Sequence, residues 1–131
     1  MFCGKHLIRT LPVFVSILLS ANFILAGDDD SAAAEKMLKL QLASIVAGDY
    51  ERFIEHGNKA FKEFYDQWSF DTLKMSRSAK LSKGYKLAYL GVIRRVGMHE
   101  HLWKVSITGD KYELLASLSL ANGKVVGFNL D

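Results

Sequence analysis

The sequence predicts a single α+β domain in which N-terminal helices pack on a four-stranded antiparallel sheet. From residue 31 to residue 83 the apolar residues recur at helical spacing, whereas from residue 84 to residue 131 they alternate with polar residues as in strands. Short turn sequences join every pair of predicted strands, which leaves no room for the crossover that a parallel sheet requires. Helices layered on the apolar face of a meander sheet are therefore expected.

The first 26 residues are interpreted as a signal peptide. Lys5 and Arg9 precede the apolar run LPVFVSILLSANFILA, and the polar sequence GDDDSAAAEK follows it. These are the parts of a secretory signal, and Ala26 is the expected last residue removed. The alternative is an uncleaved anchor, but the run has about 15 residues against roughly 20 for a comfortable span. We expect residues 27–131 to be secreted, most simply into a bacterial periplasm, without a stable membrane anchor.

Charge and cysteine content restrict the function classes. The chain has 17 Lys and Arg against 14 Asp and Glu. Loss of Lys5 and Arg9 with the signal leaves 15 basic residues, which nearly balance the acids. Nucleic acid is not an expected partner, because binding it requires a concentrated positive surface. Cys3 also leaves with the signal, so the exported domain depends on its core rather than on disulfides.

Four helices are predicted in the first half. Ser31 can cap the first, whose apolar stripe is Ala34, Leu38, Leu42 and Ile45. Asp49 can cap a short second helix that ends near Gly57, and Asn58 can cap a third. The third is expected to pack through the stripe Phe61, Phe64, Tyr65 and Trp68. A fourth helix, opened by Ser69 and ending near Gly84, has only a thin apolar stripe.

Four strands are predicted in the second half, over residues 85–96, 99–108, 111–120 and 124–131. Asn122-Gly123 between two alternating runs is a strong hairpin signal. Alternation assigns the faces of the strands. The side expected to face the helices carries His101, Trp103, Val105 and Ile107 in the second strand and Val126, Phe128 and Leu130 in the fourth. Leu115 and Val125 are expected on the opposite, mostly polar face.

Two motifs make the chain resemble the nuclear transport factor two-like superfamily, also called cystatin-like or SnoaL-like. AGDYERFIEH follows the first helix, and LANGKVVGFNLD forms the closing hairpin, as in small secreted members of unknown function. The resemblance covers residues 31–131. It implies a strongly curved, cone-like sheet with helices in its concave side, and homodimers paired through the sheet. The superfamily holds isomerases, dehydratases and cyclases as well as ligand-binding and accessory domains, so the resemblance alone selects no function.

The histidine pair in MHEHLW is the first chemical candidate. His99 and His101 share a strand face and lie about 6.5–7 Å apart along it. A zinc site needs three or four protein ligands, and His56 and Glu100 are the nearest other candidates. We expect no metal and no cofactor. His101 is expected to be half-buried at the rim of the sheet, with contact to a small ligand as the alternative.

Aromatic residues are the second candidate, because buried Tyr and Trp need partners for their polar atoms and often line partly wet cavities. Core packing explains most of them. If the cone holds a ligand pocket, its expected walls are Tyr50, Tyr65, Trp68, Tyr89, His101 and Trp103. No catalytic residue is assigned, because no buried acid is paired with a histidine and no glycine-rich elbow surrounds a serine.

These patterns favour an exported, non-enzymatic binding or accessory domain. It is expected to hold a small apolar ligand in the cone or to form a homodimer through the sheet. The alternative is an isomerase- or dehydratase-like enzyme that uses the same cone. That alternative requires an ionisable residue in an open cavity, and a cone filled by Phe and Leu side chains contradicts it. A self-associating assembly module with a filled cone is a third possibility.

Overall fold

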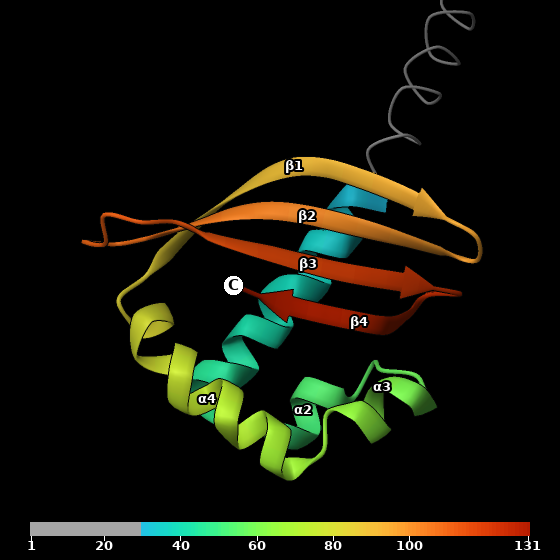
Figure 1. Ribbon diagram of the computed structural model, residues 1–131, viewed down its shortest axis with the longest axis horizontal. Helices are drawn as coiled ribbons and strands as arrows, with labels where there is room; N and C mark the ends of the chain where they lie inside the picture. Colours follow the sequence, from blue (N-terminus) through green and yellow to red (C-terminus); the bar gives the residue numbers. More distant parts are fainter. Residues whose placement is uncertain (1–29) are drawn as a thin grey trace, which may run out of the picture. The chain divides into compact units, whose positions relative to one another are not determined.

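Helices lead into an antiparallel sheet in the computed structural model, which describes residues 30–131 (Figure 1). Residues 34–131 form one compact unit. The signal peptide predicted for residues 1–26 lies outside the described residues. The first described helix runs from residue 30 to residue 47.

The first helix buries the stripe that the sequence predicts. Ala34, Leu38, Leu42 and Ile45 are all 0 % exposed. The helix ends where Gly48 takes a φ of +70°, a left-handed conformation that glycine adopts without steric cost. The side chain of Asp49 then accepts a hydrogen bond from the backbone of Arg52 and begins α2 (Tyr50–Ile54).

The third and fourth helices divide at a different point from the one predicted. Asn58 caps α3 (Lys59–Phe64), as expected. The next cap is Asp66 rather than Ser69, because its carboxylate accepts a hydrogen bond from Ser69 N at 2.8 Å and begins α4 (Gln67–Ser82). The predicted stripe through Trp68 was therefore wrong in part. Phe64 is 72 % exposed and Trp68 is 75 % exposed, because the break redirects the chain between them.

The sheet is an antiparallel meander, as predicted. Its strands are β1 (Tyr85–Arg95), β2 (Met98–Ile107), β3 (Leu114–Ala121) and β4 (Lys124–Leu130), hydrogen-bonded in the order β1-β2-β3-β4 (Figure 1). The third strand begins at Leu114 rather than at residue 111. Tyr112 lies before it and is 77 % exposed.

Two irregularities in strand pairing change which residues face the helices. In β1, Leu90 is an extra residue between Tyr89, which pairs with Trp103, and Gly91, which pairs with Leu102. In β4, Val126 is an extra residue between Val125, which pairs with Leu120, and Gly127, which pairs with Ser119. A bulge shifts the alternation by one residue. Val125 is consequently fully buried, so its predicted place on the polar face was wrong.

The core lies between the helices and one face of the sheet. That face of β2 buries His101, Trp103, Val105 and Ile107, as alternation predicts. From the helices, Leu38, Leu42, Phe53 and Phe70 pack into the same apolar cluster. Leu115, on the opposite face, is 43 % exposed, as expected.

The loop between α2 and α3 is tied to β4, and this positions α3. Gly57 and Val125 form an isolated parallel bridge. Val125 N donates to the carbonyl of His56 at 2.8 Å, and Asn58 N donates to the carbonyl of Val125 at 3.0 Å. Figure 1 shows α2, α3 and α4 gathered on the β4 side of the sheet. The start of α3 is therefore held against the start of β4.

Candidate functional site

The six residues predicted to line one pocket do not come together. Tyr50 and Tyr65 lie beside each other on the helical side, near β4. Tyr89, His101 and Trp103 form a separate group on β1 and β2. Trp68 lies on α4 with 75 % of its surface exposed. In the structure, the six predicted residues are therefore distributed over two clusters and one surface position.

The two tyrosines of the first cluster act as ties between elements. The Tyr50 hydroxyl donates to the carbonyl of Tyr65 at 2.6 Å, and the Tyr65 hydroxyl donates to the carbonyl of Phe128 at 2.8 Å. Burial raises the pKa of Tyr65 above its ordinary value. The pKa of Tyr50 is also raised, first by burial and then by the carboxylate of Asp66. Both hydroxyls therefore stay protonated and serve as structural donors at neutral pH.

The second cluster combines ring contacts with polar atoms. His101 is 3 % exposed, more buried than the half-buried position expected at a rim. Its Nδ1 lies 2.9 Å from the Tyr89 hydroxyl. The Trp103 ring lies 5.5 Å from Tyr89 and 6.0 Å from His101, between ring centroids. Trp103 Nε1 is buried and has no hydrogen-bond partner within residues 30–131. The cluster thus brings a hydroxyl, an imidazole and an indole into one packed group.

An apolar groove of about 410 Å³ lies between α3 and β4. Phe61 and Phe128 are almost fully buried beneath it, at 2 % and 7 % exposed, whereas Phe64 stands 72 % exposed beside them. Its lining residues are Ala60, Phe61, Phe64, Tyr65, Val126, Gly127 and Phe128. Of the six predicted pocket residues, only Tyr65 lines this groove. Sequence reasoning missed Phe64 because it assigned that ring to the core, and missed Val126 because alternation does not reveal the bulge.

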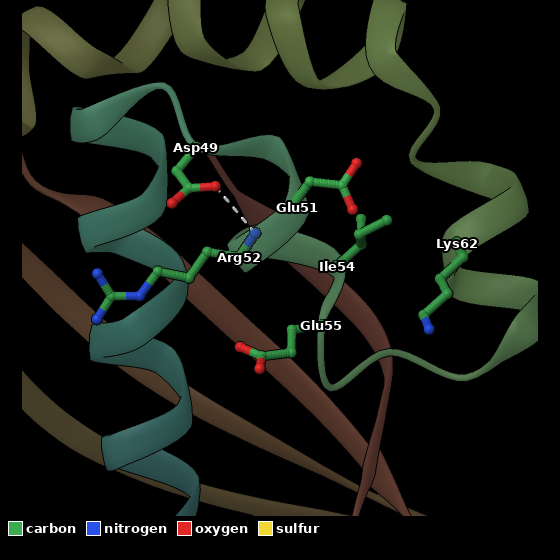
Figure 2. Close-up of a pocket in the computed structure, with 6 residues that line it drawn as sticks. All are labelled: Asp49, Glu51, Arg52, Ile54, Glu55 and Lys62. Carbon is green, nitrogen blue, oxygen red and sulfur yellow. Dashed lines mark hydrogen bonds between the residues drawn. The ribbon is translucent and has the colours of Figure 1, made fainter.

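A second pocket, of about 560 Å³, lies beside α2 and α3 and is charged. It is lined by Asp49, Glu51, Arg52, Ile54, Glu55 and Lys62 (Figure 2). Figure 2 shows the Arg52 guanidinium directed away from Lys62, on the far side of α2. Acidic and basic groups of this open surface are solvated, and such groups select a ligand less sharply than a desolvated site does. The apolar groove is therefore the stronger candidate.

Residues 30–131 contain neither a cluster of metal ligands nor a membrane-spanning helix. No three His, Cys, Asp or Glu side chains in this part of the chain are grouped so that they could hold a metal ion. Within the same residues, no helix has both the length and the apolar character needed to cross a bilayer.

Comparison with known proteins adds no family: no protein-family model, curated protein or solved structure matches the chain.

Proposed function

We propose that this chain is a small exported binding domain, not an enzyme, and that it holds an apolar ligand in the groove between α3 and β4. The observation that carries the proposal is the groove itself. Phe64 keeps 72 % of its surface exposed beside the buried rings of Phe61 and Phe128. A large exposed aromatic ring at the edge of an apolar depression is a common feature of ligand-binding surfaces.

The groove is favoured over the interior of a cone-like domain, where the sequence pattern would put a ligand. Leu38, Phe53, Phe70 and Trp103 pack there with at most 1 % of their surface exposed. Side chains buried to this extent are close-packed and leave little room for a substrate. This packing also counts against the isomerase- or dehydratase-like alternative, which needs an open cavity around an ionisable residue.

The lining of the groove indicates the class of ligand. Its lining residues are aromatic, aliphatic or glycine, and among them Tyr65 alone has a polar side-chain group, its hydroxyl. The hydroxyl is already engaged with the carbonyl of Phe128. No charged side chain contributes to the lining. An uncharged molecule with an aromatic or branched alkyl part therefore fits better than a sugar, a nucleotide or an organic acid.

Binding of Nile red, an uncharged apolar dye, tests this proposal. Phe64→Ala removes an exposed wall, so we expect about tenfold weaker binding of the dye and a change of at most about 0.5 kcal/mol in the free energy of unfolding. Met75→Ala is the matched control, because Met75 is an 85 % exposed apolar side chain of α4 that does not line the groove. Equal affinity of the wild type and Phe64→Ala would contradict the proposal. Native mass spectrometry of protein from its source would identify a co-purified ligand.

A second candidate function is pairing of two copies through the sheet face that points away from the helices. Leu90, Ile93 and Leu115 support it, with exposed fractions of 58 %, 42 % and 43 %. Aliphatic surface of this kind favours association when it is contiguous. Sedimentation should show a dimer that Leu115→Glu dissociates. Wild-type protein that remains monomeric at high concentration would exclude pairing through this face.

Export and superfamily membership are parts of the same proposal. Support for export is the basic and then apolar sequence of residues 1–26, and support for membership is the order of helices followed by a meander sheet. N-terminal sequencing of protein recovered from the cell exterior or periplasm should begin near Gly27. A mature chain that begins at Met1 would contradict cleavage.

A further inference from the structure

The two edges of the sheet differ in how their outward backbone groups are satisfied. At the β4 edge, Val125 exchanges two hydrogen bonds with the loop before α3. The carbonyl of Phe128 accepts from Tyr65, and the carbonyl of Leu130 accepts from Arg77 Nε at 3.2 Å. Helices and their connecting loop therefore satisfy outward backbone groups of β4 at Val125, Phe128 and Leu130.

At the β1 edge, the register identifies the groups that point outward. Thr108 N donates to the carbonyl of Gly84, and in an antiparallel pair such bonded positions recur at every second residue. Beyond the bulge, Gly91 pairs with Leu102 and Ile93 with Glu100. The backbone N–H and C=O of Val92 and Arg94 consequently point away from β2. Within residues 30–131 no other strand pairs with β1 on that side.

The side chains along this part of β1 are apolar on one sheet face and basic on the other. Ile93 is 42 % exposed on the face that points away from the helices. Arg94 has the opposite orientation, is exposed, and has no ion pair among residues 30–131. The neighbouring Arg95 is already paired with Glu100, at 3.1 Å between Nη2 and Oε1. The open edge thus presents one unpaired cation beside an aliphatic side chain.

We propose that residues 92–95 of β1 are a docking edge for an extended segment of another protein in which acidic and apolar residues alternate. The segment adds antiparallel or parallel to β1 as a fifth strand, and its backbone bonds to Val92 and Arg94. Its acidic side chains face Arg94, and its apolar side chains lie beside Ile93. The bulge at Leu90 interrupts the edge, so the docked segment is short.

A second copy of this chain is a poorer occupant of the same edge. Pairing β1 with another β1 would bring Arg94 and Arg95 of both copies onto one short ladder. Residues 85–95 contain Lys86 and two arginines but no acidic residue, so nothing in the second β1 would compensate these charges. Like charges across a strand pair are destabilising. Charge complementarity therefore selects an acidic partner.

The probe for this docking edge is a short synthetic peptide in which glutamate alternates with valine, compared with the same peptide carrying lysine in place of glutamate. Binding to the full exported protein is measured by fluorescence anisotropy, and the amide signals of Val92 and Arg94 are followed by NMR. The glutamate peptide is expected to bind and to shift those amides. Arg94→Glu should weaken its binding about fivefold or more. Lys124→Glu, the same charge change on β4, should leave the affinity unchanged.

A second variant distinguishes the contribution of backbone hydrogen bonds to peptide binding from the contribution of the Arg94 charge. Val92→Pro removes an N–H that points away from β2, so the sheet should remain intact while peptide binding falls about tenfold or more. Equal binding of both peptides, or undiminished binding to Arg94→Glu, would overturn the proposal. Nile red binding is expected to be unchanged in Arg94→Glu, so loss of the docking edge is distinguishable from loss of the apolar groove.

Discussion

Phe53 and Trp103 each lie at the centre of an aromatic group, and the two groups bury polar atoms in different ways. The Phe53 group consists of Phe53, Phe61, Tyr65, Phe70 and Phe128, and it joins the helices to β4. The Trp103 group consists of Tyr89, His101 and Trp103, and it lies on β1 and β2. Both centres are almost completely buried, at 1 % and 0 % exposed.

In the Phe53 group the one polar side chain is fully used. Phe53 lies 5.1–5.8 Å from four other rings, between centroids, and Tyr65 donates its hydroxyl to the β4 backbone. In the Trp103 group the indole N–H has no hydrogen-bond partner in the described part of the chain, residues 30–131. Leaving a buried donor unpaired costs about 1–3 kcal/mol. Substitutions in the first group should therefore lower the free energy of unfolding strongly. In the second group, a substitution that removes the indole N–H should change it little.

The largest expected effect is on Phe53→Ala. Truncation removes one ring from contact with four others and leaves a cavity, so we expect a loss of about 3–5 kcal/mol in the free energy of unfolding. Urea denaturation measures this loss. Met75→Ala, at an 85 % exposed position, should change stability by less than about 0.5 kcal/mol. A similarly small effect of Phe53→Ala would show that this group is not the centre of the core.

A smaller effect is expected for Tyr65→Phe, which keeps the ring and removes the hydroxyl. The carbonyl of Phe128 then loses its donor from the helical side. Loss of one such hydrogen bond should cost about 1 kcal/mol, measured by urea denaturation. Tyr112→Phe is the control, because Tyr112 is 77 % exposed and its hydroxyl forms no hydrogen bond within residues 30–131. Equal stability of both variants would mean that Tyr65 does not secure the β4 edge.

The same tyrosine predicts an alkaline dependence of stability. Burial raises the folded-state pKa of Tyr65 above its ordinary value of 10.0, so the folded state holds this proton more tightly than the unfolded state. The resulting stabilisation is fully present below about pH 10 and is lost as the pH rises through the folded pKa. Tyr65→Phe should therefore lose stability less steeply than the wild type between neutral and strongly alkaline pH. Parallel stability curves for the two proteins would contradict this assignment.

Sequence periodicity was sufficient for the order of helices and strands, because each element buries one side and its apolar residues repeat with the period of that element. The exceptions are places where a single residue changes the phase. Asp66 and Ser69 are both suitable helix caps in the sequence. Because α3 ends at Phe64, the cap of α4 is Asp66. The extra residues Leu90 and Val126 reverse the faces of the residues around them, and alternation cannot show this because it assumes a regular ladder.

The candidate site was less predictable, for a related reason. Composition identified Tyr65, Tyr89, His101 and Trp103 as aromatic or polar residues suited to a cavity wall, but it carries no information on which of them meet. The groove depends on the exposure of Phe64 and on the course of β4 at Val126. Both follow from the helix break and the bulge, so the local changes of phase also determine which residues line the groove.

The smallest expected effect is on Trp103→Phe, and it tests the contrast between the two groups most directly. A smaller ring leaves a cavity that costs about 1–2 kcal/mol. Removal of the indole N–H, which has no hydrogen-bond partner within residues 30–131, recovers about 1–3 kcal/mol, so the net change should lie between a loss of about 1 kcal/mol and a gain of about 2 kcal/mol. Phe70→Leu, in the Phe53 group, removes a comparable volume without a polar atom and should cost about 1–2 kcal/mol. A loss of about 3 kcal/mol for Trp103→Phe would mean that the indole N–H has a partner in solution, such as a buried water. The two groups would then bury their polar atoms in the same way.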